Sequence, residues 1–569
     1  MYQTIAGENN TRQPSTWLVV FLMLGLLPVS SLFAAGKLSP DLAGLPPTGN
    51  LDVIVQFVSP PSASDLARIA QQGGHLKAQF QNIPSVVFSV PVAALNGIAA
   101  DPRIRYISPD RKLAGALEFA EPTVGANIAL QYGFDGGGVG VAVIDSGIAG
   151  DHPDLKPRVV YSQNFVSNES TTSDLYGHGT HVSGIVAGNG SASTGQSFIY
   201  TFRGIAPKAN LINLRVLDSQ GHGTDSGVIA ALDRAIDLKS TYGIRIVNLS
   251  LGRSIFESYT LDPLCQAVER AWQAGLVVVT AAGNNGRDNS MGTMGYATIS
   301  APGNDPYVIT VGAMKDMSTT VREDDLLASY SSKGPTLLDH IVKPDLLAPG
   351  NNIVSAMNSS AGLRQQFPAN VVPVSYYKNG NQGSSSAVYF RLSGTSMAAP
   401  MVSGAAALLL QQQTSLTPDQ VKARLMKSAT KNFPSSSTYT DPTTGVTYQS
   451  TYDLFSVGAG YLDVWAALNR NDYSTGSATS PTAVYDSDNR VTSIVAAPGS
   501  VWQDAVVWGT AVVWGTNVIT ANDTAVVWGT AVVWGTNTTD AFAVVWGTSV
   551  VWGTSQNFPE SVAIQGERQ

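Results

Sequence analysis

Five apolar runs between residues 139 and 314 constrain the fold more than any other feature of the chain. Each run is rich in Val, Ile and Leu at consecutive positions, which is typical of parallel strands that helices cover on both faces. Helical and polar stretches separate the runs, so the sequence predicts a doubly wound α/β domain with a parallel sheet, over residues 116–470. The runs are VGVAVID, NLINLRVL, RIVNLSL, LVVVTAAG and YVITVGAM.

Residues 1–35 have the pattern of a secretory signal peptide. Arg12 precedes an uncharged run from Trp17 to Leu27, and Pro28 and the small pair Ala34–Ala35 follow it. A short apolar core followed by a helix breaker and small residues indicates cleavage during export. An uncleaved membrane anchor is the alternative, because the run extended to Ala35 is about long enough to span a bilayer.

Residues 36–115 predict a small α+β domain. LDVIVQF, PSVVFSV and RIRYIS are typical of strands, and SASDLARIAQQG and VAALNGIAADP are typical of helices. At this size the domain is close to the minimum for independent folding. The pattern by itself gives no function.

Charge and cysteine content exclude several classes of protein. The net charge is −8 and only 13% of residues are charged, which argues against a protein that binds the nucleic-acid backbone. The single cysteine, Cys265, excludes an internal disulfide and every cysteine-based zinc cluster. It lies in LDPLCQAVERAW, which predicts an amphipathic helix, so we interpret Cys265 as a buried structural residue.

Three side chains of the types that acyl transfer needs lie at predicted ends of elements. Asp145 ends the first apolar run, His178 begins an apolar helix, and Ser396 lies at a loop-to-helix junction with Pro400 in the first turn. A serine hydroxyl needs an adjacent base, and an imidazole needs a carboxylate that fixes its tautomer. Alone, each residue is better explained as a cap; together with their flanking sequences, they indicate a nucleophilic site.

The chain resembles the subtilisin-like serine peptidases, or subtilases, in VIDSG, HGTHVSG and GTSMAAP, and further in GIAPKANL, VNLSLG, VVTAAGN and KPDLLAPG. The order Asp, His, Ser is also that of subtilisin. The resemblance covers about residues 120 to 470 and implies a subtilisin-like fold. It implies that Asp145, His178 and Ser396 are the catalytic residues.

The resemblance also implies an oxyanion hole and a peptide-binding cleft. Asn284 in AAGN would donate its side-chain amide to the oxyanion, beside the backbone N–H of Ser396. Substrate would pair with exposed strand edges and enter a primary pocket lined by small residues, which suits a bulky apolar side chain. Arg253 and a long segment from Met357 to Leu392 depart from the family pattern and weaken that specificity prediction. The implied substrate-binding residues are Ser250, Leu251, Gly252, Gly221, His222, Gly223, Ala281, Ala282 and Gly283.

No metal or cofactor is expected in the chemistry. His178 and His181 are three residues apart without a nearby third ligand, and no HExxH motif occurs. Structural calcium, which many subtilases hold, has no assignable ligands here. Asp154 matches a calcium ligand of some relatives, but NGSASTGQSFIYTFRG lacks the usual ligand loop, so we interpret Asp154 as a cap or turn residue.

The small N-terminal domain resembles the inhibitor-like propeptide of subtilases. Such a propeptide assists folding and blocks the cleft until it is removed, and a template is useful because parallel sheets fold slowly. The sequence predicts self-cleavage between about Lys112 and Glu121. The chain's own propeptide is therefore an expected inhibitory partner.

Residues 471–569 form a distinct tail in which VVWGT occurs six times. Even spacing within each pair of repeats places both indoles on one face of a strand, so the tail predicts a β-rich repeat structure. The tryptophan face has three alternative roles: it binds carbohydrate or a cell-surface polymer, it mediates anchoring and self-association, or it forms an indole core or a cap for the protease without a ligand. Three strands are expected, over Ala505–Thr516, Ala525–Thr536 and Ala543–Thr554, with polar connectors NVITANDT and NTTDAF.

The whole sequence predicts a secreted serine endopeptidase that acts on proteins or peptides and is made as an autoprocessed precursor. The alternative is a catalytically silent subtilase-fold binding module with a surface-anchoring tail. The intact Asp, His, Ser and Asn set argues against that alternative.

Overall fold

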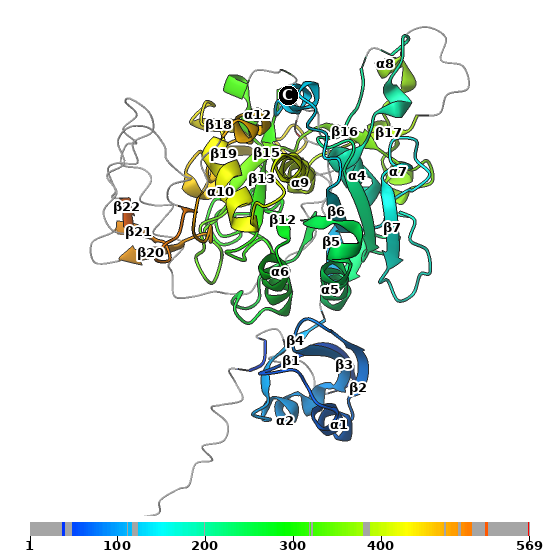
Figure 1. Cartoon of the computed structure of the whole chain (residues 1–569). Coiled ribbons are helices and arrows are strands. Elements are labelled where there is room, and N and C mark those ends of the chain that lie inside the picture. The colour runs from blue at the N-terminus through cyan, green and yellow to red at the C-terminus, as the bar shows by residue number, and fades with distance from the viewer. Residues whose placement is uncertain are drawn as a thin grey trace, which may run out of the picture.

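A computed structural model gives the architecture (Figure 1). It describes residues 37–39, 42, 48–110, 112–115, 123–198, 200–317, 319, 322–378, 387–470, 474–486, 491–502, 518–521 and 567. The predicted signal peptide and the three predicted tail strands lie outside these residues. Within them, no helix combines the length and apolarity that crossing a bilayer would require.

The centre of the molecule is an eight-stranded sheet in the order β14-β13-β12-β10-β6-β8-β7, with β15 also paired to β13. The five apolar runs form five of its strands in parallel register. One detail of the prediction is wrong, because β14 runs antiparallel to β13 and makes the sheet mixed. The strands are β6 (Gly140–Asp145), β7 (Val159–Asn164), β8 (Asn210–Arg215), β10 (Ile244–Leu249), β12 (Val277–Ala281), β13 (Ile309–Lys315), β14 (Leu326–Leu327) and β15 (Leu346–Pro349).

Helices cover this sheet, and every residue of β6 and β12 is buried, as expected for strands between two helical layers. Helix α4 packs against α9, and α5 packs against α6. Cys265 is buried in α6, as predicted. The helices of this body are α3 (Ala126–Gln131), α4 (His178–Ala187), α5 (Asp225–Tyr242), α6 (Pro263–Gln273), α7 (Gly362–Gln366), α8 (Val374–Tyr377), α9 (Thr395–Gln412), α10 (Pro418–Ser428), α11 (Leu454–Val457) and α12 (Val464–Leu468).

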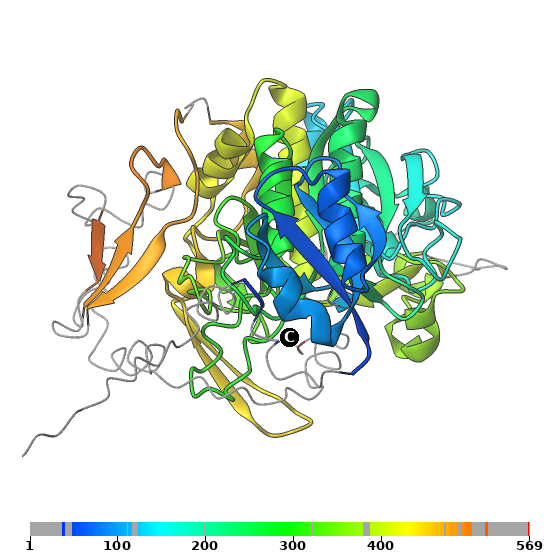
Figure 2. The same ribbon diagram turned by 90° about the horizontal axis from the view of Figure 1, so that it is seen from below.

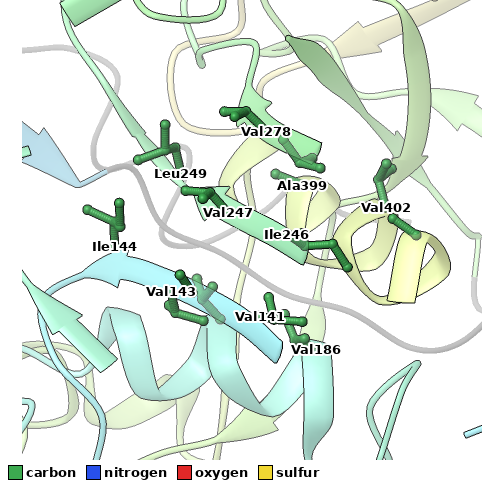
Figure 3. Packing of buried hydrophobic residues seen from close by; sticks show 14 of the residues in the cluster. Val141, Val143, Ile144, Val186, Ile246, Val247, Leu249, Val278, Ala399 and Val402 are labelled. Atoms are coloured by element: carbon green, nitrogen blue, oxygen red, sulfur yellow. The ribbon is translucent and has the colours of Figure 1, made fainter. Parts of the chain in front are cut away.

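One hydrophobic cluster joins the sheet to its helices (Figure 3). Val141 and Val143 of β6 and Ile246 of β10 share it with Val186 of α4 and Val402 of α9. Burying each such side chain contributes about 1.5–3 kcal/mol. This core therefore fixes the ends of β6, α4 and α9 relative to one another.

Short strands and 3-10 turns complete the body. Strand β16, just before the long segment that begins at Met357, pairs with β17 at the end of that segment, and β18 pairs with β19 as a hairpin. The strands are β9 (His222–Thr224), β11 (Leu251–Gly252), β16 (Ile353–Ala356), β17 (Tyr389–Leu392), β18 (Ser436–Thr440) and β19 (Thr447–Thr451), and the 3-10 turns are Ser191–Ser193, Arg322–Asp324 and Pro368–Asn370. A further 3-10 turn, Val92–Ala94, belongs to the N-terminal domain.

The N-terminal residues form the predicted α+β domain, with a four-stranded sheet in the order β2-β3-β1-β4. Strand β2 was not predicted, because HLKAQ is polar and mostly exposed and has no apolar run. A capping box at Ser62 begins α1. The elements are β1 (Asn50–Phe57), α1 (Ala63–Gln71), β2 (His75–Gln79), β3 (Ser85–Pro91), α2 (Leu95–Ala99) and β4 (Ile104–Pro109).

The sheet of this domain lies between its own helices and helices α5 and α6 of the body (Figures 1 and 2). Alternate residues of β1 face the two sides: Val53 and Val55 pack within the N-terminal domain, and Ile54 joins the core cluster of the body. Asp233 of α5 accepts backbone N–H groups of Gln81 and Asn82 at 2.8 and 2.9 Å. The docking surface is therefore both apolar and hydrogen-bonded.

Part of the tail forms a three-stranded antiparallel sheet, β20-β21-β22. The prediction that NVITANDT is a polar connector is wrong for its first half, because VITA is rich in β-branched residues and forms β22, which pairs with β21. Trp502 is fully buried near this sheet. The strands are β20 (Thr482–Asp486), β21 (Val491–Val495) and β22 (Val518–Ala521).

Candidate active site

Asp145 and His178 are brought into direct contact. Asp145 is the last residue of β6 and His178 is the first residue of α4, and both side chains are buried. His178 Nδ1 lies 2.7 Å from Asp145 Oδ1, which also accepts the backbone N–H of Ser146 at 2.7 Å. His178 Nε2 is buried without a hydrogen-bond partner among the described residues. This arrangement orients the imidazole and leaves its other nitrogen available for a proton.

Asp174, which the sequence analysis missed, holds the start of helix α4. Its Oδ1 accepts the N–H of Gly177 at 2.6 Å and the hydroxyl of Ser146 at 2.8 Å, and its Oδ2 accepts the N–H of Thr180 at 2.8 Å. Complete burial raises the pKa of Asp174, although these hydrogen bonds act in the opposite direction. An acidic residue just before an apolar helix is a known signal of a helix N-terminus, so the sequence could have indicated a capping role for Asp174.

His181 lies one turn along α4 from His178, and its ring contacts β16 and β17 rather than Asp145. Its Nε2 lies 3.2 Å from the carbonyl of Ile353 and 3.1 Å from that of Phe390. Burial lowers the pKa of His181 to about 3, so the ring is neutral and Nε2 donates to these carbonyls. His181 therefore ties α4 to β16 and β17.

Ser396 is the second residue of α9 and is fully buried. Its hydroxyl donates to the carbonyl of Ser250 at 3.2 Å, and the hydroxyl of Ser250 donates to the carbonyl of Ser396 at 2.7 Å. The predicted position of Pro400 is wrong, because it lies in the second turn of α9. Since proline has no N–H, it leaves the carbonyl of Ser396 available to Ser250.

Asn284 lies beside this serine, just beyond the end of β12. Its Oδ1 accepts the backbone N–H of Thr395 at 3.0 Å and the Thr395 hydroxyl at 3.2 Å. Its Nδ2 is buried and has no partner among the described residues. An unpaired buried donor costs free energy unless a ligand uses it. Thr395 thus orients the Asn284 amide. The sequence did not predict this role, although Thr395 lies next to Ser396 in the GTS motif.

The two expected strand edges are both occupied by one strand, β5 (Lys112–Gly115), in the order β11-β5-β9. Leu251 and Gly252 of β11 pair antiparallel with Gly115 and Ala114. His222 and Gly223, which follow Gly221, pair with Ala114 and Leu113 on the other side. Figure 1 shows β5 within the body, apart from the sheet of the N-terminal domain. An extended peptide of this chain therefore lies between the segments predicted to bind substrate.

The expected pocket residues lie at the end of β12. Ala281 and Ala282 are buried, and the N–H of Ala282 donates to Val311 at 3.0 Å. Gly283 has φ +107°, and a Cβ there would lie 2.5 Å from Ser300 Oγ, so only glycine fits. That these three residues line a substrate pocket stays a prediction.

Arg253, which departs from the family pattern, is turned into the protein. Its Nε lies 3.0 Å from Asp225 Oδ1 and its Nη2 lies 2.8 Å from Asp262 Oδ2, and all three side chains are buried. Asp225 is in the first turn of α5 and Asp262 is the N-cap of α6. The guanidinium thus joins two helix N-termini beside the docked N-terminal domain.

In the described part of the chain, no group of three or more His, Cys, Asp or Glu side chains is arranged to hold a metal ion. Asp154 accepts the hydroxyl of Tyr389 at 2.6 Å and the N–H of Ala192 at 2.8 Å. It therefore holds the loop after α4 against β17 through long-range hydrogen bonds, and its role as a cap or turn residue stays a prediction.

Comparisons with known proteins agree with this architecture. Residues 136–460 match the subtilase family model. The chain is 39% identical over 363 residues to serine protease AprX of Bacillus subtilis, covering 62% of this chain and 76% of that protein. It is 35% identical over 317 residues to subtilisin DY of Bacillus licheniformis, covering 56% and 93%.

A solved structure shares the fold. Fervidolysin from Fervidobacterium pennivorans, described as a keratinolytic enzyme related to subtilisin, superimposes with a TM-score of 0.56 at 22% identity. The match covers 79% of this chain and 64% of that one. The family model covers more than half of the 569 residues. The chain therefore belongs to the subtilase family and is a subtilisin-type serine endopeptidase.

Proposed function

We propose that the protein hydrolyses peptide bonds with Ser396 as nucleophile, His178 as general base and Asp145 as the group that orients His178. The observation that carries the proposal is the buried His178–Asp145 contact of 2.7 Å beside an unpartnered Nε2. A neutral His178 with Nδ1–H on Asp145 presents a lone pair at Nε2, which is what proton abstraction from a serine hydroxyl needs.

The reaction proceeds in two halves. Ser396 Oγ exchanges its bond with the Ser250 carbonyl for one with His178 Nε2, attacks the scissile carbonyl carbon and transfers its proton to Nε2. The tetrahedral oxyanion accepts hydrogen bonds from Asn284 Nδ2 and the Ser396 N–H. The C–N bond breaks, His178 gives the proton to the leaving amine, and water then hydrolyses the acyl ester by the same route.

Casein hydrolysis by the protein secreted after expression of the whole chain tests this assignment. Ser396→Ala should reduce the rate by at least about 10⁴-fold, since loss of a nucleophile in such a site leaves only residual catalysis. Ser403→Ala is the matched control, because Ser403 lies on the same helix and donates to Asn248 at 2.8 Å. Activity that survives in Ser396→Ala would refute the assignment, and an inactive wild-type chain would favour the silent binding module.

We propose further that the N-terminal domain is an inhibitory propeptide. Strand β5 occupies both edges where substrate would pair, which supports inhibition by blocking. Asp110 accepts the N–H of Ser226 at 2.6 Å in the first turn of α5 and so brings the chain to that position. The positive end of the helix dipole favours this carboxylate, although burial raises the pKa of Asp110.

Self-cleavage then separates this domain from the body during export. N-terminal sequencing and intact mass of the secreted product should give a mature chain beginning between about Lys112 and Glu121, with residues 1–35 also removed. The Ser396→Ala chain should keep residues 36–115. Ser396→Ala protein of mature size from a host without other proteases would contradict self-processing.

A further inference from the structure

Glu567, in the last residues of the tail, is buried in a polar site on the body. Its Oε1 accepts the N–H of Ser329 at 2.7 Å and lies 3.1 Å from Arg287 Nη2, while its Oε2 lies 2.7 Å from Lys315 Nζ. The side chain of Glu567 is 0% exposed. We name the body residues that contact Glu567 the carboxylate site: Arg287, Lys315, Ser329, Asn351 and Asn352.

The carboxylate site also binds the main chain of Glu567. The Glu567 N–H donates to Asn351 Oδ1 at 2.9 Å. Its carbonyl accepts Nδ2 of Asn351 and of Asn352, both at 3.2 Å. The asparagine amides form hydrogen bonds with the peptide N–H and C=O of Glu567, and the cations bind the side-chain carboxylate of the same residue. This combination fits a glutamate within a peptide rather than a free anion.

Charge balance in this region requires an acidic occupant. Arg287 and Lys315 are 11% and 4% exposed in their side chains, and Arg287 also lies 3.2 Å from Asp441 Oδ2. Without Glu567, Arg287 would keep only Asp441, and Lys315 would lose the only carboxylate with which it forms an ion pair in the described part of the chain. An uncompensated buried charge is strongly unfavourable. The site is therefore electrostatically incomplete until a second carboxylate enters.

The hairpin of β18 and β19 covers the carboxylate site. The Tyr439 ring lies 4.8 Å from the Arg287 guanidinium and 5.0 Å from Lys315 Nζ, and Tyr448, its cross-strand partner, lies 4.8 Å from Arg287. Cations held over aromatic faces are stabilised and oriented. Both cations are thus fixed in place around the occupant.

The carboxylate site is built on the loops that carry the candidate active-site residues. Arg287 follows Asn284 by three residues, and its Nε donates to Ser329 Oγ at 2.7 Å. The N–H of Asn352 donates to Ser393 Oγ at 3.1 Å, three residues before Ser396. Occupancy of the site therefore braces both loops.

We propose that the carboxylate site is a receptor for a glutamate-containing peptide and that its occupant is the chain's own C-terminal segment, latched through Glu567. The latch holds the end of the tail on the body independently of the polypeptide that joins them. A tail cut between residues 503 and 566 would consequently remain bound by its C-terminal fragment. This proposal does not depend on the catalytic assignment.

The test uses full-length chains in the Ser396→Ala background, so that no self-digestion occurs. Glu567→Lys places a third cation in the carboxylate site and vacates it, whereas Glu560→Lys makes the same charge change elsewhere in the tail and leaves Glu567 in place. Fluorescence anisotropy then measures binding of labelled SVAIQGERQ, the sequence of residues 561–569, and of SVAIQGQRQ, its Gln counterpart.

We expect SVAIQGERQ to bind the Glu567→Lys chain at least about tenfold more tightly than SVAIQGQRQ, because only the glutamate forms charge-assisted hydrogen bonds with Arg287 and Lys315. The Glu560→Lys chain, whose site is occupied, should bind neither peptide. Adding Lys315→Met to Glu567→Lys should abolish the preference. Equal binding of the two peptides, equal binding by the two chains, or no binding at all would overturn the proposal.

Unfolding provides a second readout that does not need the free peptide. The urea midpoint of the Glu567→Lys chain should fall below that of Glu560→Lys, because the buried cations lose their partner. Identical midpoints would show that Glu567 is not bound in solution and would also overturn the latch.

Discussion

The Asn284 side chain uses its two polar atoms for different purposes. Its Oδ1 is fixed by Thr395, and its Nδ2 is buried without a partner in the described residues. Such a division holds the donor in position before any substrate charge develops, which is how an oxyanion hole acts. The role assigned to Asn284 therefore concerns turnover more than substrate affinity.

Asn284→Asp removes the donor proposed for the oxyanion hole and keeps an oxygen that can accept the hydrogen bonds of Thr395. We expect kcat to fall by about 10²- to 10³-fold or more, with KM little changed, since the lost interaction belongs to the transition state. Steady-state kinetics on a peptide substrate measures the change. An unchanged kcat would remove Asn284 from the mechanism.

Sequence patterns located the chemical groups and missed those that orient them. Asp145, His178 and Ser396 were each predicted at the end of an element, where the structure has them. Asp174 and Thr395 were missed because each acts through backbone N–H groups or an amide that the fold brings close. Asp174 lies 28 residues from its partner Ser146, and Thr395 lies 111 residues from Asn284. Local signals mark both positions, an acidic residue before α4 and the threonine of GTS, but the distant group that each residue orients depends on contacts that leave no local pattern.

Helix α4 begins with His178 and is tied to β16 and β17 through His181. His181 stays neutral in the folded protein, because burial lowers its pKa to about 3. In the unfolded chain its pKa is about 6.5, so below that pH the unfolded state takes up the proton first. The stability that depends on neutral His181 is thus complete above about pH 6.5 and declines as the pH falls toward 3.

His181→Gln removes this titration and keeps a donor for the two carbonyls. In the Ser396→Ala background, the unfolding free energy of the His181 chain should fall, relative to the Gln variant, by up to about 1.4 kcal/mol per pH unit between pH 6.5 and 3. Urea unfolding at a series of pH values measures it. His75→Gln, on exposed β2, is the control. Parallel pH profiles for all three chains would contradict the neutral His181.

Strands with long apolar runs can be predicted from the sequence, whereas the short strands β14 and β5 cannot. The five apolar runs form central strands because their burial on both faces leaves a continuous hydrophobic pattern. Strand β14 has two residues, and β5 has four that pair only with distant edges. Their pairing depends on tertiary contacts rather than on local propensity.

At the scale of the whole molecule, both ends of the chain reach the same catalytic body. The N-terminal domain docks on α5 and α6, whose N-termini Arg253 joins, and sends β5 between β11 and β9. Glu567 returns from the tail to loops beside Asn284 and Ser396. The domain boundaries at 35, 115 and 470 stay predictions. The role of the Trp-rich repeats also stays a prediction, because most of the tail lies outside the described residues.

The central claim is that Ser396 is a nucleophile activated by His178. Labelling of the mature enzyme with a fluorophosphonate, followed by peptide mapping, tests it most directly. One adduct per chain is expected on Ser396, with loss of peptide hydrolysis in step with labelling and no adduct in His178→Ala. An adduct on another residue, or hydrolysis that continues after complete labelling of Ser396, would contradict the claim.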